Sequence, residues 1–219
     1  MTALSLISDF IVPLRTSDTG EEALEMMGEF GVRHLPIVND KQFLGLIAED
    51  DILNFDVSEP VGAYSLSLSQ PFVRDTDHLY EVMRTLAESQ LTVVPVVDEE
   101  TNYVGLITLE NLLHYFAQAG SFAERGSILV LDISKRDYSL AEIARIVESE
   151  NALVISSFIT SHADSTRLEV TIKVNRHHIQ SILATFNRFD YEVKASYNEA
   201  EYVDSLKERY DSLMSYLNV

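Results

Sequence analysis

Two stretches of the chain carry nearly the same phrase: GLIAEDD at residues 45–51 and GLITLEN at residues 105–111. The phrase ends a longer internal repeat, in which Pro36 pairs with Pro95 at an offset of 59 residues. After these prolines the offset becomes 60, because one residue is inserted between NDK in the first copy and DEETN in the second. An insertion in a polar turn costs little. The repeat therefore predicts two copies of one structural unit.

Both copies show the same order of elements. Each opens with apolar residues spaced for one face of a helix: Gly20, Ala23, Leu24 and Met27 in the first copy, and Leu79, Val82, Met83 and Leu86 in the second. Two short β-branched strands joined by a hairpin come next, and a short helix closes each copy. The strands are predicted at 35–40 and 43–48, then at 94–99 and 103–108, and the closing helices at 49–55 and 109–116. Asp18 with Glu21 predicts a capping box at the start of the first helix.

A different pattern begins after residue 120. Strands are predicted at 127–134, 153–160, 168–174 and 191–197, and apolar faces predict two helices, one with Leu140, Ile143, Ala144 and Val147 and one with Ile179, Ile182, Leu183 and Phe186. Ser139 and Glu142 have the spacing of a second capping box. The predicted order over residues 126–198 is βαββαβ.

The last segment, residues 199–219, carries a heptad-like stripe. Its apolar residues are spaced by three and four positions: Val203, Leu206, Tyr210, Leu213 and Leu217. The segment is too short for a stable isolated coiled coil. We expect an amphipathic helix that packs on its own domain or on a partner subunit.

Charge and composition limit the possible partners. The formal net charge is −19, of which −15 falls in residues 1–120 and −4 in residues 121–219. Such a field repels nucleic acid and anionic lipid, so we expect neither as a partner. Cysteine is absent, which favours a reducing compartment. No run approaches the roughly 18 apolar residues of a spanning helix and no basic leader opens the chain, so we expect a cytoplasmic location.

The duplicated motif resembles the tandem cystathionine-β-synthase-type (CBS) repeat. The resemblance covers about residues 1–120, with repeat one at about 1–60 and repeat two at about 61–120. It rests on the apolar strand with its proline, on the phrase Gly-apolar-apolar-Thr-x-x-Asp/Asn, and on the duplication. The resemblance implies two clefts that hold adenosine-containing ligands, with the Asp or Asn bonded to the ribose hydroxyls and the Ser or Thr bonded to ribose or phosphate.

Transferred to this chain, the resemblance places the better-preserved site in repeat two. Thr108 and Asn111 lie three residues apart at a helix start, Gly105 precedes them, and a strand beside the base is expected at Pro71, Phe72 and Val73. In repeat one, Asp51 can take ribose hydroxyls, but Ala48 replaces the hydroxyl residue and two further acids, Glu49 and Asp50, would repel a phosphate. We therefore expect an adenosine ligand to prefer repeat two.

A structural interpretation of the same residues stays open. Thr108 and Asn111 can equally cap the closing helix, and Gly105 can be a turn glycine. His34 either lines the first cleft or is a structural histidine. The six histidines lack metal-ligand spacing, the acidic side chains of residues 49–51 cannot all face one ion, and no nucleophile sits in a recognised motif. We expect no metal site, no required cofactor and no catalysis.

Residues 126–198 resemble an ACT domain, a ferredoxin-like module that binds small effectors at paired interfaces. Its position after a CBS pair is similar to the CBS–ACT proteins of the acetoin-utilisation type. The family usually has a glycine before the first helix, whereas this loop reads SKRDYSLAE with Asp137 and Tyr138. The departure makes a dimerisation role at least as well supported as amino-acid binding.

Taken together, the sequence predicts an α/β (α+β) protein with a CBS pair, an ACT-like domain and a C-terminal helix. The leading hypothesis is a cytoplasmic sensor that binds AMP, ADP, ATP, S-adenosylmethionine or a related adenosyl compound, forms a homodimer and acts on an unknown protein target. The alternative is a non-catalytic dimerisation scaffold with vestigial clefts.

Overall fold

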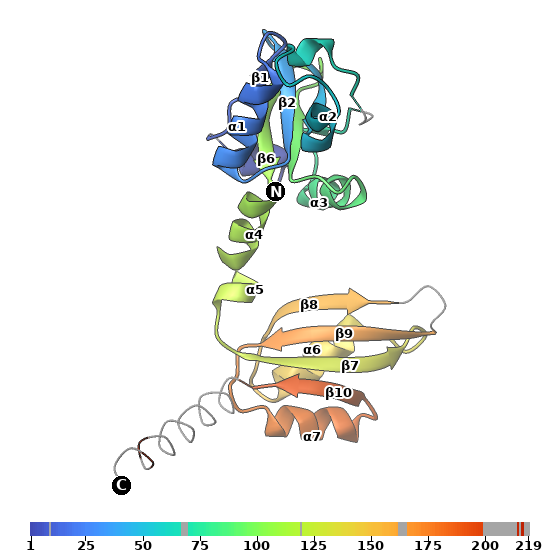
Figure 1. The fold of residues 1–219 in the computed structure, drawn as a ribbon. Helices are drawn as coiled ribbons and strands as arrows, with labels where there is room; N and C mark the ends of the chain where they lie inside the picture. Colours follow the sequence, from blue (N-terminus) through green and yellow to red (C-terminus); the bar gives the residue numbers. More distant parts are fainter. Residues whose placement is uncertain are drawn as a thin grey trace. The chain divides into compact units, whose positions relative to one another are not determined.

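The structure is a computed structural model that describes residues 1–8, 10–66, 70–118, 120–161, 166–198, 214 and 216. The chain forms two compact units, Met1–Phe116 and Ala117–Val219, whose elements are labelled in Figure 1. The stripe predicted for residues 199–219 falls outside the described residues, apart from Met214 and Tyr216, so the helix expected there stays a prediction.

The first unit contains the two repeats, each built from the same series of elements. Repeat one comprises the 3-10 helix η1 (Ala3–Leu6), β1 (Leu14–Arg15), α1 (Gly20–Phe30), β2 (His34–Asn39), β3 (Gln42–Ala48) and α2 (Glu49–Leu53). Repeat two comprises the 3-10 helix η2 (Val61–Ala63), β4 (Val73–Arg74), α3 (Leu79–Glu88), β5 (Val93–Val97), β6 (Tyr103–Thr108) and α4 (Leu109–Gln118). The predicted hairpins and closing helices are confirmed.

Each repeat folds into a three-stranded sheet, ordered β1-β2-β3 or β4-β5-β6. The first strand is parallel to the second, and the second and third form an antiparallel hairpin. The registers correspond: Pro36 pairs with Leu46, and Pro95 pairs with Leu106. In both hairpins the register shifts between the two residues that follow the proline, so that one residue, Leu44 or Val104, is skipped immediately before the glycine of the repeated phrase. The duplication in sequence is thus a duplication of backbone geometry.

The start of α1 differs by one residue from the sequence prediction. Thr19, rather than Asp18, is the N-cap, and it forms the capping box with Glu22 rather than Glu21. The backbone N–H of Thr19 donates to Glu22 at 2.9 Å. Asp18 instead accepts from the backbone N–H of Arg15 at 2.7 Å, closing the turn after β1. The carboxylate needed for that turn is unavailable as a cap, so the prediction of an Asp18–Glu21 box was wrong.

The N-terminal segment of repeat one lies on the outer strand of repeat two. Ser8 donates its N–H to the carbonyl of Leu106 at 2.8 Å, and Ile7 covers Gly105 on β6. A Cβ at Gly105 would lie 2.5 Å from Ile7 Cγ2. The residue is therefore a glycine in a strand rather than in a turn, and the missing side chain makes room for Ile7.

The segment that leads into repeat two makes the corresponding contact with repeat one. Leu66, which is 59 residues after Ile7, covers Gly45 on β3, where a Cβ would lie 2.6 Å from Leu66 Cδ1. Gln70 adds a side-chain bond of 2.9 Å from its amide to the carbonyl of Leu44. Each repeat therefore covers an outer strand of the other, which protects edges that would otherwise expose unpaired backbone groups.

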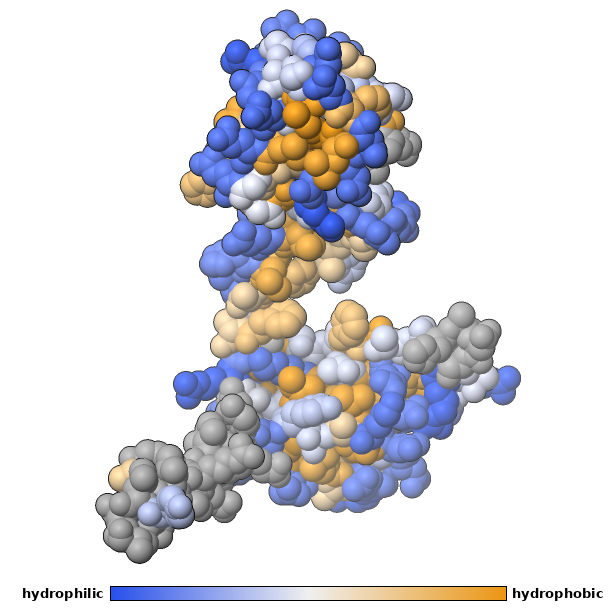
Figure 2. Space-filling view, in the orientation of Figure 1, coloured by the Kyte–Doolittle hydropathy of each residue, from blue (hydrophilic) through white to orange (hydrophobic). Residues whose placement is uncertain are grey.

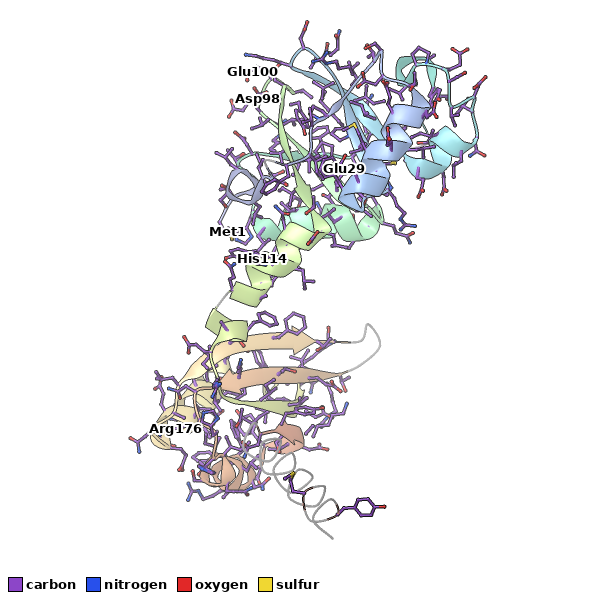
Figure 3. The ribbon with its side chains drawn as sticks, turned by 60° about the vertical axis from the view of Figure 1, so that its left-hand side comes forward. Met1, Glu29, Asp98, Glu100, His114 and Arg176 are labelled. Carbon is purple, nitrogen blue, oxygen red and sulfur yellow. The ribbon has the colours of Figure 1, made fainter. Side chains whose placement is uncertain are left out.

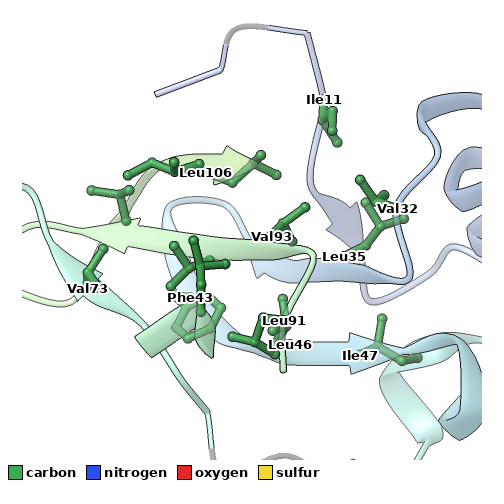
Figure 4. Close-up of a cluster of buried hydrophobic side chains, with 14 of the residues drawn as sticks. Ile11, Val32, Leu35, Phe43, Leu46, Ile47, Val73, Leu91, Val93 and Leu106 are labelled. Carbon is green, nitrogen blue, oxygen red and sulfur yellow. The ribbon is translucent and has the colours of Figure 1, made fainter. Parts of the chain in front are cut away.

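One continuous core joins the two repeats. Leu35 and Leu46 from repeat one and Val93 and Leu106 from repeat two are fully buried in the same cluster, and Figure 4 shows the strands that carry them crossing close to one another. The helix faces predicted from periodicity supply the remainder, with Ala23 and Met27 of α1 and Leu79, Val82 and Leu86 of α3 buried. Neither repeat has a core of its own.

The second unit contains α5 (Gly120–Ala123), β7 (Ser127–Ser134), α6 (Leu140–Ser149), β8 (Val154–Thr160), β9 (Arg167–Val174), α7 (Gln180–Arg188) and β10 (Glu192–Tyr197). The sheet is antiparallel with the order β10-β7-β9-β8. Apolar residues of α6 and α7 pack on one side of the sheet around Leu131 and Ile172. The predicted βαββαβ order is confirmed, and the arrangement is consistent with an ACT-like domain.

Ser139 caps α6 as predicted, accepting from the N–H of Glu142 at 3.3 Å. The Glu142 carboxylate accepts the Tyr191 hydroxyl at 3.2 Å, which ties α6 to the strand end before β10. Ser139 thus makes the hydrogen bond expected of a capping box, whereas the Glu142 side chain bonds to Tyr191.

Substituting Gly105 tests the contact between the repeats. Gly105→Ala would force Ile7 to move, and overpacking of this kind costs about 1–3 kcal/mol. Ile7→Ala removes the clash, so the two substitutions together should cost less than the sum of the single costs, as measured by urea denaturation of all four proteins. Gly28→Ala is the control, because no described atom lies within 4 Å of the added carbon. Additive costs for Gly105 and Ile7 would contradict the contact.

Candidate functional site

A cavity of 240 Å³ opens in the first cleft, where the two repeats meet. Repeat one contributes the start of β2 and the junction of β3 with α2, and repeat two contributes the end of α3. The lining residues are Arg33, His34, Ala48, Glu49, Asp50, Ser89 and Gln90. The volume is slightly below the range of about 300–1,000 Å³ for pockets that enclose a whole ligand. A ligand the size of a nucleoside would therefore stay partly exposed here.

His34 forms the inner wall of this cavity and links the two repeats. Its side chain is only 9% exposed. The ring Nδ1 lies 3.2 Å from the backbone N of Thr92 and 3.0 Å from the Thr92 hydroxyl oxygen. The same hydroxyl accepts from the backbone N–H of Arg33 at 2.9 Å. Two consecutive residues of repeat one are therefore fixed to one threonine of repeat two.

The protonation state of His34 follows from these contacts. Because the Thr92 N–H donates to Nδ1, that nitrogen accepts, and the proton of the neutral ring is on Nε2. Burial lowers the pKa of His34, and the nearby Arg33 guanidinium lowers it further, against the opposing effect of Asp51, Asp50 and Glu49. Among the described residues Nε2 has no hydrogen-bond partner, so the ring offers an N–H donor at the cavity wall.

In repeat two, the position that corresponds to Ala48 is a helix cap. Thr108, 7% exposed, accepts the N–H of Asn111 at 2.9 Å, and its hydroxyl donates to Asn111 Oδ1 at 2.7 Å. The capping interpretation is thus confirmed for Thr108. The arrangement uses the threonine proton and the amide oxygen internally and leaves the Asn111 amide N–H groups as donors for a ligand. The role of both side chains in ligand binding stays a prediction.

The remaining predicted site residues lie in different surroundings. Val73 is buried, and it pairs with Val96, three positions along β5 from Val93, the partner of Thr108. Phe72 packs edge-on against Phe43 of repeat one, with ring centroids 6.2 Å apart. Pro71 immediately precedes Phe72, outside the short strand β4.

Gly105 and Asp51 have structural partners. Gly105 accommodates Ile7, as described above, and Asp51 is 6% exposed and accepts the backbone N–H of Ala48 at 3.1 Å. The structure therefore brings Thr108 and Asn111 together but gives the other predicted residues separate packing or capping roles. Contact of any of them with a ligand stays a prediction.

Arg33, Ser89 and Gln90 of the cavity were not predicted from the sequence. The internal repeat could have indicated them, since Gln90 corresponds to Gly31 at the offset of 59 residues. Both residues end a helix with a left-handed backbone, at φ of 52° and 64°. Glycine adopts this conformation without steric cost, whereas glutamine does not. The glutamine at this position places a polar side chain in the cavity lining, where repeat one has no side chain.

The second unit has a cavity of 480 Å³ at the end of the sheet where Ser127 pairs with Val174. Its lining residues are Glu150, Asn151, Asn175, Arg176, His177, His178, Ser181 and Ile182. Arg176, labelled in Figure 3, donates from Nε to the carbonyl of Asn151 at 3.0 Å. The SKRDYSLAE loop lies at the opposite end of the sheet, where Asp137 closes a turn and Tyr138 packs against the core.

The described residues contain neither a cluster of metal ligands nor a membrane-spanning helix. No group of three or more His, Cys, Asp or Glu side chains there is arranged to hold a metal ion. Likewise, no helix within the described part of the chain combines the length and hydropathy that crossing a membrane requires.

A family model described as the CBS domain matches residues 5–58 and again residues 63–118. The chain belongs to the CBS domain family. The two matches coincide with the two repeats, so the first unit is a tandem CBS pair and the clefts described above are those of the pair. The comparisons identify no catalytic domain.

Related proteins share the CBS pair at low identity. An uncharacterised protein of Methanocaldococcus jannaschii is 26% identical over 99 residues, which cover 45% of this chain and 37% of that protein. A CBS domain pair/ACT domain protein from Thermotoga maritima is 24% identical, with a TM-score of 0.49 over 54% of this chain and 98% of its own. CBSX2, solved in complex with AMP, is 25% identical, with a TM-score of 0.46 over 53% and 96%.

The buried His34 predicts a pH-dependent stability of the CBS pair. Its pKa is lowered from the ordinary value near 6.5, so the unfolded chain takes up a proton before the folded protein does. The stabilisation is complete above the unfolded pKa and is lost as the pH falls toward the lowered pKa of the folded state. His34→Asn keeps an acceptor near Thr92 but does not titrate.

Denaturant unfolding of the wild type and of His34→Asn between about pH 7.5 and about pH 5 measures the difference. Wild type should lose more unfolding free energy than the variant on acidification. The other titratable groups are common to both proteins and cancel. Parallel losses would contradict the assignment of a neutral, buried His34.

Proposed function

We propose that the CBS pair is the ligand-binding part of a regulatory protein and that an adenosine-containing small molecule occupies its first cleft. Membership of the CBS family supports the class of ligand. The observation that carries the proposal is the 240 Å³ cavity, because it gathers a buried imidazole, a guanidinium, a hydroxyl and an amide from both repeats around one opening. These groups offer the mixture of donors and acceptors that a nucleoside can use.

Binding at this position supplies a route to regulation. A ligand that contacts His34 of repeat one and Gln90 of repeat two bonds to both halves of the pair at once. The His34–Thr92 link is next to the same opening, so a change in the spacing of the repeats alters the cavity. A ligand shifts such an equilibrium only by its difference in affinity for the two arrangements. The shift would be transmitted by a protein target that binds only one of the two arrangements.

The second cleft is a further candidate site. Its Asn111 amide can donate to ribose oxygens, and the Thr108 hydroxyl can turn toward a phosphate only by giving up its bond to Asn111. The sequence predicts that an adenosine ligand prefers this cleft, and the titration described below compares its affinity for the two clefts.

The second unit is proposed as an ACT-like dimerisation and effector domain. Its βαββαβ order and antiparallel sheet support the fold, while the absence of a glycine from the SKRDYSLAE loop argues against amino-acid binding there. The alternative function is a dimerisation scaffold with vestigial clefts. One observation favours it: α4 exposes the apolar side chains of Leu109 and Leu113.

Calorimetric titration with adenosine, AMP, ADP, ATP and S-adenosylmethionine tests the binding proposal. AMP is included because it is the ligand in the CBSX2 structure. At least one of these compounds should bind, and His34→Asn should weaken binding about 2- to 13-fold through loss of one neutral hydrogen bond. Asn111→Ala is the matched control in the second cleft and should leave that affinity unchanged.

Two outcomes separate the alternatives. Loss of affinity in Asn111→Ala with none in His34→Asn would move the ligand to the second cleft. Absence of binding heat for all five compounds up to millimolar concentration would contradict the sensor and favour the scaffold.

We also expect a homodimer at micromolar concentration. Figure 2 shows apolar areas interrupting the polar surface of the first unit, and on α4 Leu109 and Leu113 are 55% and 71% exposed at adjacent positions of one helix face. A second copy can cover them. Leu113→Asp should shift the mass measured by light scattering toward the 24.7 kDa of one chain, while Leu140→Asp, on α6, should not. A monomeric wild type across that range would refute the expectation.

A further inference from the structure

The charged groups around the first cleft are strongly biased toward one sign. Glu49 and Asp50 line the cavity together with a single guanidinium, that of Arg33. Asp51, next in sequence, lies near enough to act on the His34 ring along with the other two acids. Two carboxylates and one cation thus line an opening of 240 Å³, and the third carboxylate, that of Asp51, acts on His34 without lining the opening.

The bias is stronger in this cleft than in the second. At the repeat offsets, Glu49, Asp50 and Asp51 correspond to Leu109, Glu110 and Asn111, and Arg33 corresponds to Thr92. These positions therefore carry three acids and a guanidinium, a net charge of −2, at the first cleft and one acid, a net charge of −1, at the second. The field of the whole N-terminal part adds to the effect, since residues 1–120 carry a net charge of −15.

The uncharged donors of the cleft fit a neutral ligand. The neutral His34 donates from Nε2, and the Ser89 hydroxyl and Gln90 amide provide further polar groups at the rim. The carboxylates of Glu49 and Asp50 accept hydroxyl or ammonium protons. A nucleoside carries hydroxyl donors and ring acceptors that can pair with such groups, whereas a polyphosphate places its negative charge beside the acids.

We infer that the first cleft selects adenosine compounds of zero or positive net charge, and discriminates against nucleotides in proportion to their phosphate charge. The inference rests on the proposed function, because it concerns the ligand of the same cleft. At about 6 Å in a water-like dielectric, each unit of negative charge on the ligand lowers affinity about 3-fold for each carboxylate whose charge the Arg33 guanidinium does not offset.

Four compounds that share the adenosine moiety and differ in charge test the inference with the full-length protein: 5′-amino-5′-deoxyadenosine, which is cationic, adenosine, AMP and ATP. Affinity measured by calorimetry should fall in that order. The cationic probe should bind at least about 3-fold more tightly than adenosine, and AMP more weakly by a similar factor or more. Raising the ionic strength from about 0.01 M to about 1 M should compress the series by screening.

The double variant Glu49→Gln/Asp50→Asn should raise the affinity for AMP and ATP relative to adenosine and lower that for the amino compound relative to adenosine. Glu110→Gln is the matched control at the second cleft and should not alter the order. ATP is measured without and with Mg²⁺, since a cation held by the acids could bridge to phosphate.

The outcomes distinguish this inference from the proposal on which it rests. If AMP or ATP binds more tightly than adenosine, with or without Mg²⁺, or if the double variant leaves the order unchanged, charge selection is wrong while adenosine binding stands. If none of the four probes binds, both fail.

Discussion

The structure of the N-terminal unit depends on a reciprocal covering of strand edges. Ile7 packs where Gly105 lacks a side chain, and Leu66 packs where Gly45 lacks one. The backbone bond from Ser8 to Leu106 closes one of these contacts. Because each repeat needs a segment of the other to cover its outer strand, neither is complete alone. Folding of the two repeats together buries Leu46 and Leu106 in one shared core, and this apolar burial stabilises the pair.

This constraint also positions the clefts. Crossing segments and a common core hold the start of β2 against the loop that ends α3, so His34 and Thr92 meet although 58 residues separate them. The backbone geometry is the same in both copies, since Glu49 donates to the Arg33 carbonyl just as Leu109 donates to that of Thr92. At this point the two clefts therefore differ through their side chains. His34 against Val93 and Gln90 against Gly31 are two of these differences, beside the charged residues discussed above.

Much of the fold follows from the sequence because its signals are local or repeated. Helix faces such as Leu79, Val82 and Leu86 are periodic, and the hairpins are fixed by matching phrases. The capping box was misplaced by one residue because the sequence DTGEE satisfies the same rule in two overlapping frames. Asp18 is not the cap because its carboxylate accepts the backbone N–H of Arg15. The spacing rule does not take this local bond into account.

The candidate site was less predictable. Thr108 and Asn111 lie three residues apart, so the sequence motif identifies both. The first-cleft cavity is instead assembled from three segments that are distant in sequence, 33–34, 48–50 and 89–90. No spacing rule joins them. Ala48 was read as a loss, since it lacks the hydroxyl of Thr108, yet the groups that replace that chemistry, among them Arg33 and Gln90, come from elsewhere in the chain.

The helix starts explain why that loss is tolerated. A helix N-terminus needs acceptors for its unpaired N–H groups and for those just before it. In repeat two the Thr108 hydroxyl accepts from Asn111 N–H, and its proton must then be taken by the Asn111 oxygen. In repeat one the Asp51 carboxylate accepts the Ala48 N–H directly, so no hydroxyl is required there. The same choice determines what each cleft presents: an amide N–H in the second and a negative carboxylate in the first. The divergence of one capping residue thus gives the two clefts different polar groups at corresponding positions, the Asn111 amide in the second and the Asp51 carboxylate in the first, and this difference underlies the ligand preference that we propose.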